Sequence, residues 1–155
     1  MKLLLLVLLL APVLCSASVT GSVHVTGRLL CSKEPYKQEK VKVFEYNKIA
    51  SDGFWGEETT DDSGYFSLKT SGYDWFSVDP YIWIPNYCGQ QVAGTKQCTA
   101  SCIRIEIPQD YITEGHVPKI KFDIGTLELL NFEFGEQRSL YRVIFGGSKE
   151  CRQRP

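Results

Sequence analysis

The sequence predicts an all-β sandwich of about seven to eight strands. After residue 17, apolar and polar residues alternate in short runs, which is typical of strands with one buried face. Clusters of Gly, Asp, Ser and Pro separate these runs and predict turns. No later segment keeps the 3.6-residue apolar period of an amphipathic helix, which argues against a mainly helical fold.

The N-terminal segment, residues 1–17, has the pattern of a secretory signal peptide. Lys2 supplies a positive charge, residues 3–14 are an unbroken apolar run, and Cys-Ser-Ala at residues 15–17 offers the small residues of a cleavage site. The run is too short to cross a bilayer as a helix, which needs about 20 apolar residues. We therefore expect a secreted, extracellular protein with no integral membrane segment.

The rest of the chain reads as one domain over residues 18–138, followed by a C-terminal extension over residues 139–155. Strict alternation from Val19 to Cys31 predicts a long, half-buried first strand. Residues 41–46 predict the next strand, and residues 51–56 are interpreted as a loop. A turn at residues 61–64 leads into a further strand that starts at Tyr65.

In the second half, residues 79–88 predict a strand in which Pro80 and Pro85 cannot donate ladder hydrogen bonds, which indicates an edge strand or a bulge. Residues 102–107 predict a clean strand that ends at Pro108, and residues 120–129 predict a long strand interrupted at Gly125. Residues 141–145 predict an extra edge strand. One helical turn is expected within residues 109–115.

The charge balance argues against a nucleic-acid partner. The chain has 17 basic and 18 acidic residues, a formal net charge of −1, and no basic stripe. Such a balance gives no long-range attraction to DNA, RNA or an anionic membrane. Aromatic residues make up 12% of the chain, which is too many for a disordered secreted segment.

We expect no metal, no cofactor and no catalytic residues. The Cys98-x3-Cys102 spacing has no second close pair to complete a zinc site, and export favours disulfides. Asp61 and Asp62 lack the regularly spaced oxygen ligands of a calcium loop, so we interpret them as turn residues. The sequence contains neither a Gly-x-Ser-x-Gly elbow nor a phosphate-binding loop.

Several segments, kept in order and spacing over residues 18–138, match a known family: residues 23–31, 41–44, 60–66, 79–82, 105–108, 111–115 and 122–127, with Cys88 and Cys98. Together they resemble the transthyretin-like family of secreted nematode proteins. The resemblance implies a transthyretin-type β-sandwich and secretion, and it implies little about chemistry. The chain departs from the family pattern in Cys102 and in the tail that carries Cys151.

One enzyme activity occurs among transthyretin folds, the hydrolysis of 5-hydroxyisourate, which uses His and Arg side chains and a C-terminal Tyr-Arg-Gly-Ser. Here Tyr141-Arg142 is followed by Val-Ile instead of Gly-Ser. Acid–base catalysis needs groups that converge on one site, and nothing in the sequence indicates that His24 and His116 converge. We therefore expect a protein that is not an enzyme.

The cysteines that remain after signal-peptide removal are expected to be mostly paired; they are Cys31, Cys88, Cys98, Cys102 and Cys151. Our first choice is a Cys88–Cys98 bond, because both match family cysteines and flank a turn-like loop. Cys102 is the rival partner of Cys88. For Cys31 three outcomes stay open, namely a bond to Cys102, a bond to Cys151 or a buried thiol. The odd count leaves one cysteine free or bonded to a second chain.

Aromatic side chains are the candidate binding surface. By strand parity, Tyr81, Trp83 and Tyr87 share one face, and Phe54 and Trp55 lie in the predicted loop. An exposed aromatic strip buries a large area at little entropic cost on binding; the alternative is that several of these rings complete the core or cover a sheet edge. We expect an extracellular adaptor that binds an unknown protein or cell-surface partner; the alternative is a carrier of a small apolar ligand at an oligomer interface, with the oligomeric state left open.

Overall fold

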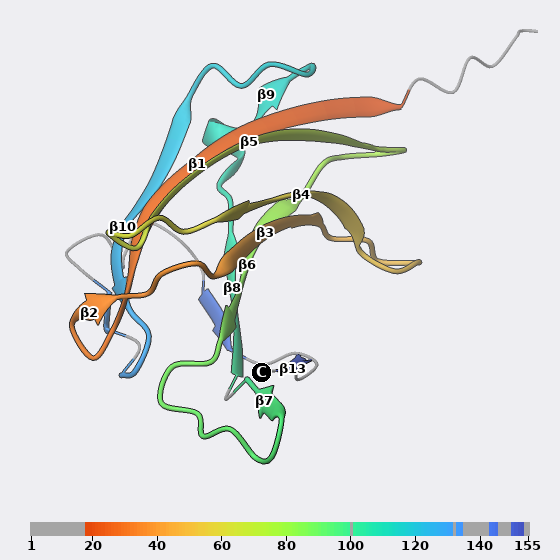
Figure 1. The fold of residues 1–155 in the computed structure, drawn as a ribbon. Helices are drawn as coiled ribbons and strands as arrows, with labels where there is room; N and C mark the ends of the chain where they lie inside the picture. Colours follow the sequence, from red (N-terminus) through yellow and green to blue (C-terminus); the bar gives the residue numbers. More distant parts are fainter. Residues whose placement is uncertain (1–17, 100, 132, 135–142, 146–149, 154–155) are drawn as a thin grey trace, which may run out of the picture.

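A computed structural model describes residues 18–99, 101–131, 133–134, 143–145 and 150–153 of the chain. Two β-sheets face each other around one hydrophobic core, and a short two-stranded sheet lies beside the C-terminus (Figure 1). This confirms the predicted all-β sandwich. The predicted signal peptide and most of the predicted C-terminal extension lie outside the described residues.

The first sheet is built around the long strand β1 (Val19–Cys31). One side of β1 pairs with β5 (Tyr65–Asp74) and β2 (Glu34–Pro35), both antiparallel. The other side pairs with β9 (Thr113–Glu114) and then, in parallel, with β10 (Lys121–Glu128), which is followed by β11 (Glu133–Phe134). The predicted first strand and the strand from Tyr65 are therefore confirmed.

A bulge shapes the β1–β10 ladder, where the register shifts between Thr26 and Arg28. Gly125 lies in this bulge with a φ of +70°, a backbone conformation that glycine adopts without steric cost. Gly27 lies opposite, and a Cβ atom there would come within 2.4 Å of the Ile124 side chain. The predicted interruption at Gly125 is thus a bulge within one continuous strand.

The second sheet has five strands in the order β12 (Val143–Phe145), β8 (Ser101–Glu106), β6 (Pro80–Asn86), β3 (Lys40–Glu45) and β4 (Gly53–Thr59). The third sheet pairs β7 (Lys96–Cys98) with β13 (Cys151–Gln153). Residues 143–145 form the predicted extra edge strand, and Gln109–Tyr111 form the predicted helical turn as one turn of 3-10 helix.

The interpretation of residues 79–88 as an edge strand is wrong, because β6 lies inside the sheet between β3 and β8. Its prolines are tolerated at the ends of the ladders. Pro80 lies opposite Glu45 on β3, one residue before the ladder with β8 begins. Pro85 lies opposite Cys102 on β8, after the ladder with β3 has ended. Each proline therefore has a neighbouring strand on one side only, where a missing N–H donor costs little.

The predicted loop over residues 51–56 is also wrong, since β4 begins at Gly53 and includes Phe54 and Trp55. Side-chain hydrogen bonds form the turn that connects β3 to β4. The Asp52 carboxylate accepts the Asn47 N–H at 3.1 Å, and the Asn47 side chain accepts the N–H groups of Ile49 and Ala50. Such local side-chain bonds replace backbone pairing in tight turns and leave the following residues free to join the sheet.

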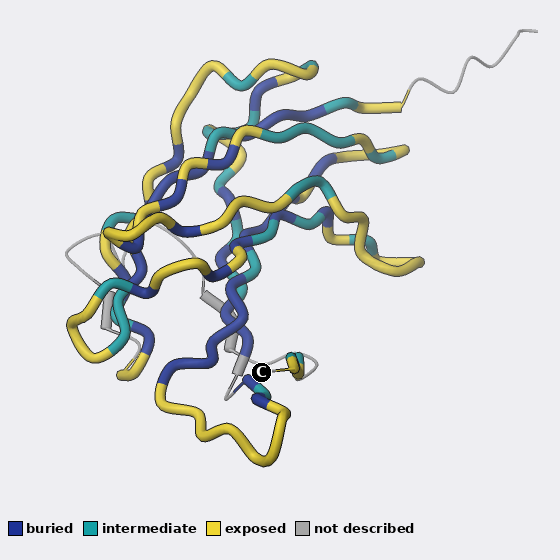
Figure 2. Tube along the Cα trace, viewed as in Figure 1, coloured by how far each residue is buried: buried dark blue, intermediate teal, exposed yellow. Residues whose placement is uncertain are grey.

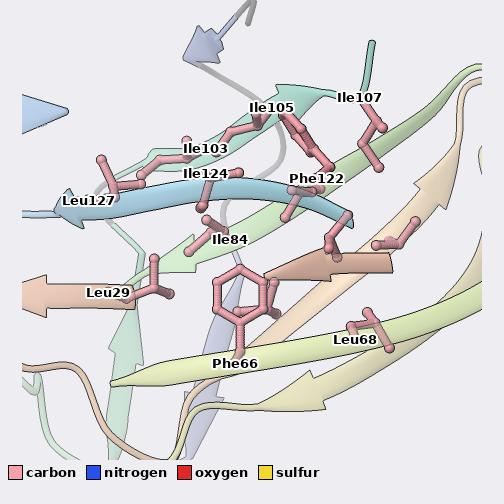
Figure 3. Packing of buried hydrophobic residues seen from close by; sticks show 14 of the residues in the cluster. Leu29, Phe66, Leu68, Ile84, Ile103, Ile105, Ile107, Phe122, Ile124 and Leu127 are labelled. Carbon is pink, nitrogen blue, oxygen red and sulfur yellow. The ribbon is translucent and has the colours of Figure 1, made fainter. Parts of the chain in front are cut away.

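The core fills the space between the two large sheets, where the buried stretches of both sheets lie (Figure 2). Ile84 and Ile103 from the second sheet approach Leu29 and Phe66 from the first (Figure 3). The largest fully buried side chains are Val23, Val25, Leu29, Val41, Phe66, Ile82, Ile84, Ile103, Ile105, Ile124, Leu127 and Leu129. The period-two alternation in the sequence therefore identifies the core face of β3 and β10, whereas β6 is buried on both faces.

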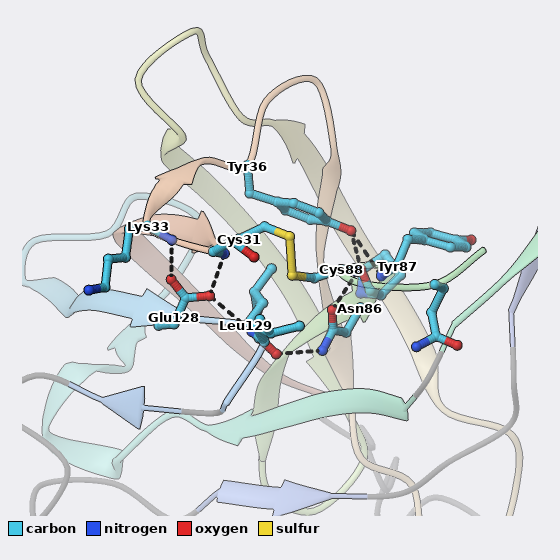
Figure 4. The surroundings of a disulfide bond; sticks show 12 residues. Cys31, Lys33, Tyr36, Asn86, Tyr87, Cys88, Glu128 and Leu129 are labelled. Atoms are coloured by element: carbon cyan, nitrogen blue, oxygen red, sulfur yellow. Dashed lines mark hydrogen bonds between the residues drawn. A yellow bond between two sulfur atoms is a disulfide. The ribbon is translucent and has the colours of Figure 1, made fainter. Parts of the chain in front are cut away.

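The Cys88–Cys98 pairing is wrong, because Cys88 bonds to Cys31 and Cys98 bonds to Cys151. Tyr36 explains the first bond: its hydroxyl donates to the Pro85 carbonyl and accepts the Tyr87 N–H, which holds the end of β6 against the turn after β1 (Figure 4). Cys98 is carried away from Cys88 by β7, where it lies directly opposite Cys151 on β13.

Cys102 carries a buried thiol, 1% exposed, that belongs to neither disulfide. Its neighbour Ile103 lies in the core, so Cys102 faces the other side of the sheet, as its sequence parity predicts. Thr99, 3.8 Å away, and the Glu150 backbone cover it there. Burial raises the pKa of this thiol, which keeps it protonated and unreactive.

Candidate functional site

Aromatic side chains form a connected cluster on the outer side of the second sheet, opposite the core. We call this the aromatic face; it comprises Phe44, Phe54, Tyr81, Trp83 and Arg104. Phe44 is its centre, with its ring centroid 5.5 Å from Phe54, 5.9 Å from Tyr81 and 6.3 Å from Trp83.

Strand register brings these rings together. Phe54 on β4 lies opposite Phe44 on β3, and Phe44 lies opposite Tyr81 on β6. One row further along the sheet, Trp83 lies opposite Arg104 on β8. Cross-strand neighbours of this kind have Cβ atoms about 4.5–5.5 Å apart, so their rings meet directly.

Exposure across the aromatic face is graded. Phe54 is 57% exposed at the edge strand, Phe44 and Trp83 are half-buried, and Tyr81 is 6% exposed. The hydroxyl of Tyr81 donates to the Asp52 carboxylate at 2.6 Å. Burial, together with this carboxylate, raises the pKa of Tyr81 and keeps its hydroxyl a donor at all physiological pH values.

Arg104 anchors the inner part of the aromatic face. Its guanidinium carbon lies 3.9 Å from the Tyr81 ring centroid and 4.6 Å from that of Tyr46. Its Nε has no hydrogen-bond partner among the described residues. The positive charge of the guanidinium is therefore stabilised by the faces of these two rings. The face therefore combines exposed apolar rings with a fixed cation.

Trp55 does not belong to this surface. The β3–β4 register shifts after Val43, and the bulge turns Trp55 towards the core while Phe54 stays outside. The indole packs flat against Gly72 on β5, where a Cβ atom would lie 2.0 Å from its Nε1. Trp55, predicted as a binding-surface candidate, is half-buried and lies apart from the aromatic face.

Tyr87 is also separate from the aromatic face: it follows β6 and is 5% exposed. Its ring is covered by the guanidinium of Arg152, whose central carbon lies 3.9 Å from the ring centroid. Of the predicted surface residues, the structure thus brings together Phe54, Tyr81 and Trp83.

The sequence prediction did not include Phe44, Tyr46 and Arg104 in the surface. A signal existed, because Phe44 and Tyr46 alternate with buried Val41 and Val43 and must point outward. The register that places Phe44 between two other rings depends on long-range pairing, which alternation alone does not reveal.

A buried carboxylate lies at one end of the sandwich. Glu45 is 3% exposed, one of its oxygens accepts the Asp79 N–H, and the other has no hydrogen-bond partner among the described residues. Burial, reinforced by the charges of Asp74, Asp79 and Asp52, raises the pKa of Glu45 to about 7. Glu45 therefore changes charge near neutral pH.

The two histidines do not form a catalytic centre. The Nε2 of His24 lies 3.0 Å from the Ser67 hydroxyl, and the Nδ1 of His116 lies 3.4 Å from the Ser71 hydroxyl. Ser67 and Ser71 are four residues apart on β5, a span of about 13 Å in a strand. Acid–base partners must lie within hydrogen-bond reach of one reacting group, and this pair does not.

Within the described part of the chain, no group of three or more His, Cys, Asp or Glu residues is arranged to hold a metal ion. Asp61 uses its carboxylate as a turn residue, accepting the N–H groups of Ser63 and Tyr65 and the Ser63 hydroxyl. A helix of the length and apolarity needed to cross a membrane is likewise not found among those residues.

Comparison with known proteins assigns the fold to a family. The transthyretin-like family model matches residues 26–108. Transthyretin-like protein 46 of Caenorhabditis elegans is 33% identical over 128 residues, which cover 82% of this chain and 70% of the relative. Transthyretin-like protein 1 of the same nematode is 30% identical over 150 residues, covering 90% of this chain and 94% of the relative.

Among solved structures, a 9R-lipoxygenase from Cyanothece matches with a TM-score of 0.37 and 18% identity, over 79% of this chain and 19% of that one. The likeness is too weak to bear on fold or function. The family match spans more than half of the chain, and the nematode relatives are aligned over most of it. On these grounds the chain belongs to the transthyretin-like family.

Proposed function

We propose that this chain is a secreted binding protein that recognises a protein or cell-surface partner through the aromatic face and performs no catalysis. The observation that carries the proposal is Phe54, which is 57% exposed while its ring contacts Phe44 edge-on. Large apolar rings that remain exposed in a folded protein favour contact with a partner.

The rigidity of the aromatic face supports this role. Its rings stand on paired strands, and Tyr81 is fixed by Asp52 on one side and Arg104 on the other. Rings held in place lose little entropy on binding, and aromatic and arginine side chains are enriched where interfaces gain most of their energy.

An extracellular location is consistent with the two disulfides, which persist in oxidising compartments. The apolar residues 3–14 agree with export through a signal peptide. Mass spectrometry of the protein secreted by a eukaryotic cell line tests this step: the mature chain should start near Ser18, and retention of an intact residue 1 would contradict it.

The binding role is tested by screening the oligomerised protein against an array of recombinant extracellular domains. The variant Phe54→Asp puts a charge on the most exposed ring of the aromatic face. Phe76→Asp is the matched control. Phe76 is 84% exposed in the connection between β5 and β6 and makes no ring contact with the residues of the aromatic face among the described residues. The wild type and Phe76→Asp should bind the same partner, and Phe54→Asp should lose at least tenfold in affinity.

Two outcomes would contradict the proposal. One is equal binding by Phe54→Asp and the wild type. The other is loss of binding by Phe76→Asp alone, which would place the contact on the β5–β6 connection. Circular dichroism of each variant establishes that the sandwich has formed before binding is compared.

A further inference from the structure

A second group of side chains surrounds the guanidinium of Arg152, near the opposite end of β3 from Glu45. Its Nη1 donates to the Glu39 carboxylate, and its Nε and Nη2 donate to the Gln97 side-chain oxygen at 3.0 and 2.9 Å. Tyr87 supplies a ring face 3.9 Å from the guanidinium carbon. We call Glu39, Tyr87 and Gln97 the guanidinium site.

The three side chains match an arginine and not a lysine. A carboxylate compensates the charge, a single amide oxygen accepts two donors of the planar fork, and a ring stacks on its face. A lysine ammonium has neither the fork nor the flat surface needed for these contacts. All three residues are buried, with 5–8% exposure, although they line a surface segment.

Interactions outside the tail hold the site in place. The Glu39 carbonyl accepts the Thr60 N–H, and the Thr60 hydroxyl accepts the Glu39 N–H. The Tyr87 N–H donates to the Tyr36 hydroxyl, and the Gln97 side chain donates to the Gln90 carbonyl. None of these bonds involves residues 150–153, so Glu39 and Tyr87 are held without Arg152. Gln97 also pairs with Arg152 in the β7–β13 ladder, and Arg152→Ala leaves that backbone pairing in place.

Arg152 reaches the site through a tethered segment. The adjacent Cys151 is bonded to Cys98, and Glu150 contributes an ion pair with Lys42 at 3.2 Å and backbone bonding to Thr99. A ligand tied so close to its site acts at an effective concentration in the millimolar range. A free arginine side chain therefore competes poorly while the disulfide is intact.

We propose that the guanidinium site is a binding site for an arginine side chain of a peptide or protein, which Arg152 fills as a tethered resident ligand. Thiol–disulfide exchange with an external dithiol, which becomes a disulfide while Cys98 and Cys151 become thiols, releases the tail and exposes the site to that ligand. The site is distinct from the aromatic face, and the proposal does not depend on the function assigned to that face.

The test is chemical complementation of the full chain. Arg152→Ala empties the site while Cys98–Cys151 and the Glu150 contacts remain. N-acetylarginine amide, titrated against this variant and followed by NMR shifts of the Tyr87 ring, should bind saturably with millimolar affinity. The wild type should bind it more weakly, because Arg152 competes for the same site, and N-acetyllysine amide should bind Arg152→Ala at least tenfold more weakly than the arginine analogue does.

The double variant Glu39→Gln, Arg152→Ala is the control for location, because it keeps the shape and removes the charge partner; binding should fall at least tenfold. A second, independent test leaves the site residues intact and loosens the tail with Cys98→Ser and Cys151→Ser, which removes the disulfide and keeps the Glu150 contacts. This protein should bind N-acetylarginine amide more weakly than Arg152→Ala does, since the tail still competes.

The proposal is overturned if folded Arg152→Ala, checked by circular dichroism, shows no saturable shift of Tyr87. It is also overturned if the lysine analogue binds as well as the arginine analogue. Should Arg152→Ala fail to fold, the untethered variant decides: absence of any arginine-dependent shift there contradicts the proposal.

Discussion

Cys31 and Cys88 are joined across the sandwich, with their Cα atoms 5.6 Å apart. Cys31 is the last residue of β1 in the first sheet, and Cys88 follows β6 in the second. Close by, the Asn86 side chain donates to the Leu129 carbonyl, so β6 is also tied to the residue that follows β10 (Figure 4). The two sheets are therefore pinned together at the end opposite Glu45.

Removing this bond should destabilise the protein strongly. The bonded cysteines are 57 residues apart, and closing a loop of that length in the unfolded chain corresponds to about 4 kcal/mol. The double variant Cys31→Ser, Cys88→Ser should lose a large part of that stability in urea unfolding. A loss below about 1 kcal/mol would contradict the account of the bond as the main link between the sheets.

The sequence predicts the fold well and the cysteine pairing poorly, for a physical reason. Alternation along Val19–Cys31 and over residues 103–107 reports which face is buried, because burial is a local, period-two property. Pairing depends on which strand ends meet in space. Cys88 and Cys98 are near in sequence, yet β7 carries Cys98 to the C-terminal segment.

The candidate surface is predicted in part, and its errors have one origin. Trp83 and Phe54 lie on the aromatic face, whereas Trp55, next to Phe54, packs inside because of a single bulge. A one-residue insertion reverses the direction of a side chain and leaves no mark in the alternation of so short a segment. Tyr87 is buried by Arg152, 65 positions later in the chain.

Gly72 is predicted to be intolerant of any side chain, because a Cβ atom would lie 2.0 Å from the Trp55 indole nitrogen. Gly72→Ala should lower the free energy of unfolding by about 1–3 kcal/mol, the usual cost of overpacking. Gly53→Ala is the matched control, since its Cβ would make only an ordinary 3.4 Å contact with Glu45. Equal stability of the two variants in urea would refute the packing of Trp55 on β5.

Stability should depend on pH through Glu45. Its pKa is raised to about 7 by burial and by three nearby aspartates, whereas the unfolded chain releases this proton near pH 4.5. The folded state therefore binds more protons between pH 4.5 and 7, so the contribution of Glu45 is full below pH 4.5 and is lost as pH rises to 7.

The variant Glu45→Gln separates this effect from other titrations. It keeps an oxygen that accepts the Asp79 N–H and cannot become charged. At pH 8 it should be more stable than the wild type by about 1–2 kcal/mol, and near pH 4.5 the difference should vanish. Urea unfolding at both pH values measures this; a constant difference at the two values would show that Glu45 does not titrate as described.

The central claim is that the aromatic face binds a partner and does not serve as a second core. Trp83→Ala tests it most directly when unfolding free energy and affinity for the partner found in the extracellular-domain screen are measured on the same protein. Because Trp83 is half-buried on the outer side of the sheet, we predict a stability loss below about 2 kcal/mol and an affinity loss of at least tenfold. A stability loss of about 3–5 kcal/mol, as for a core tryptophan, with unchanged affinity would contradict the claim.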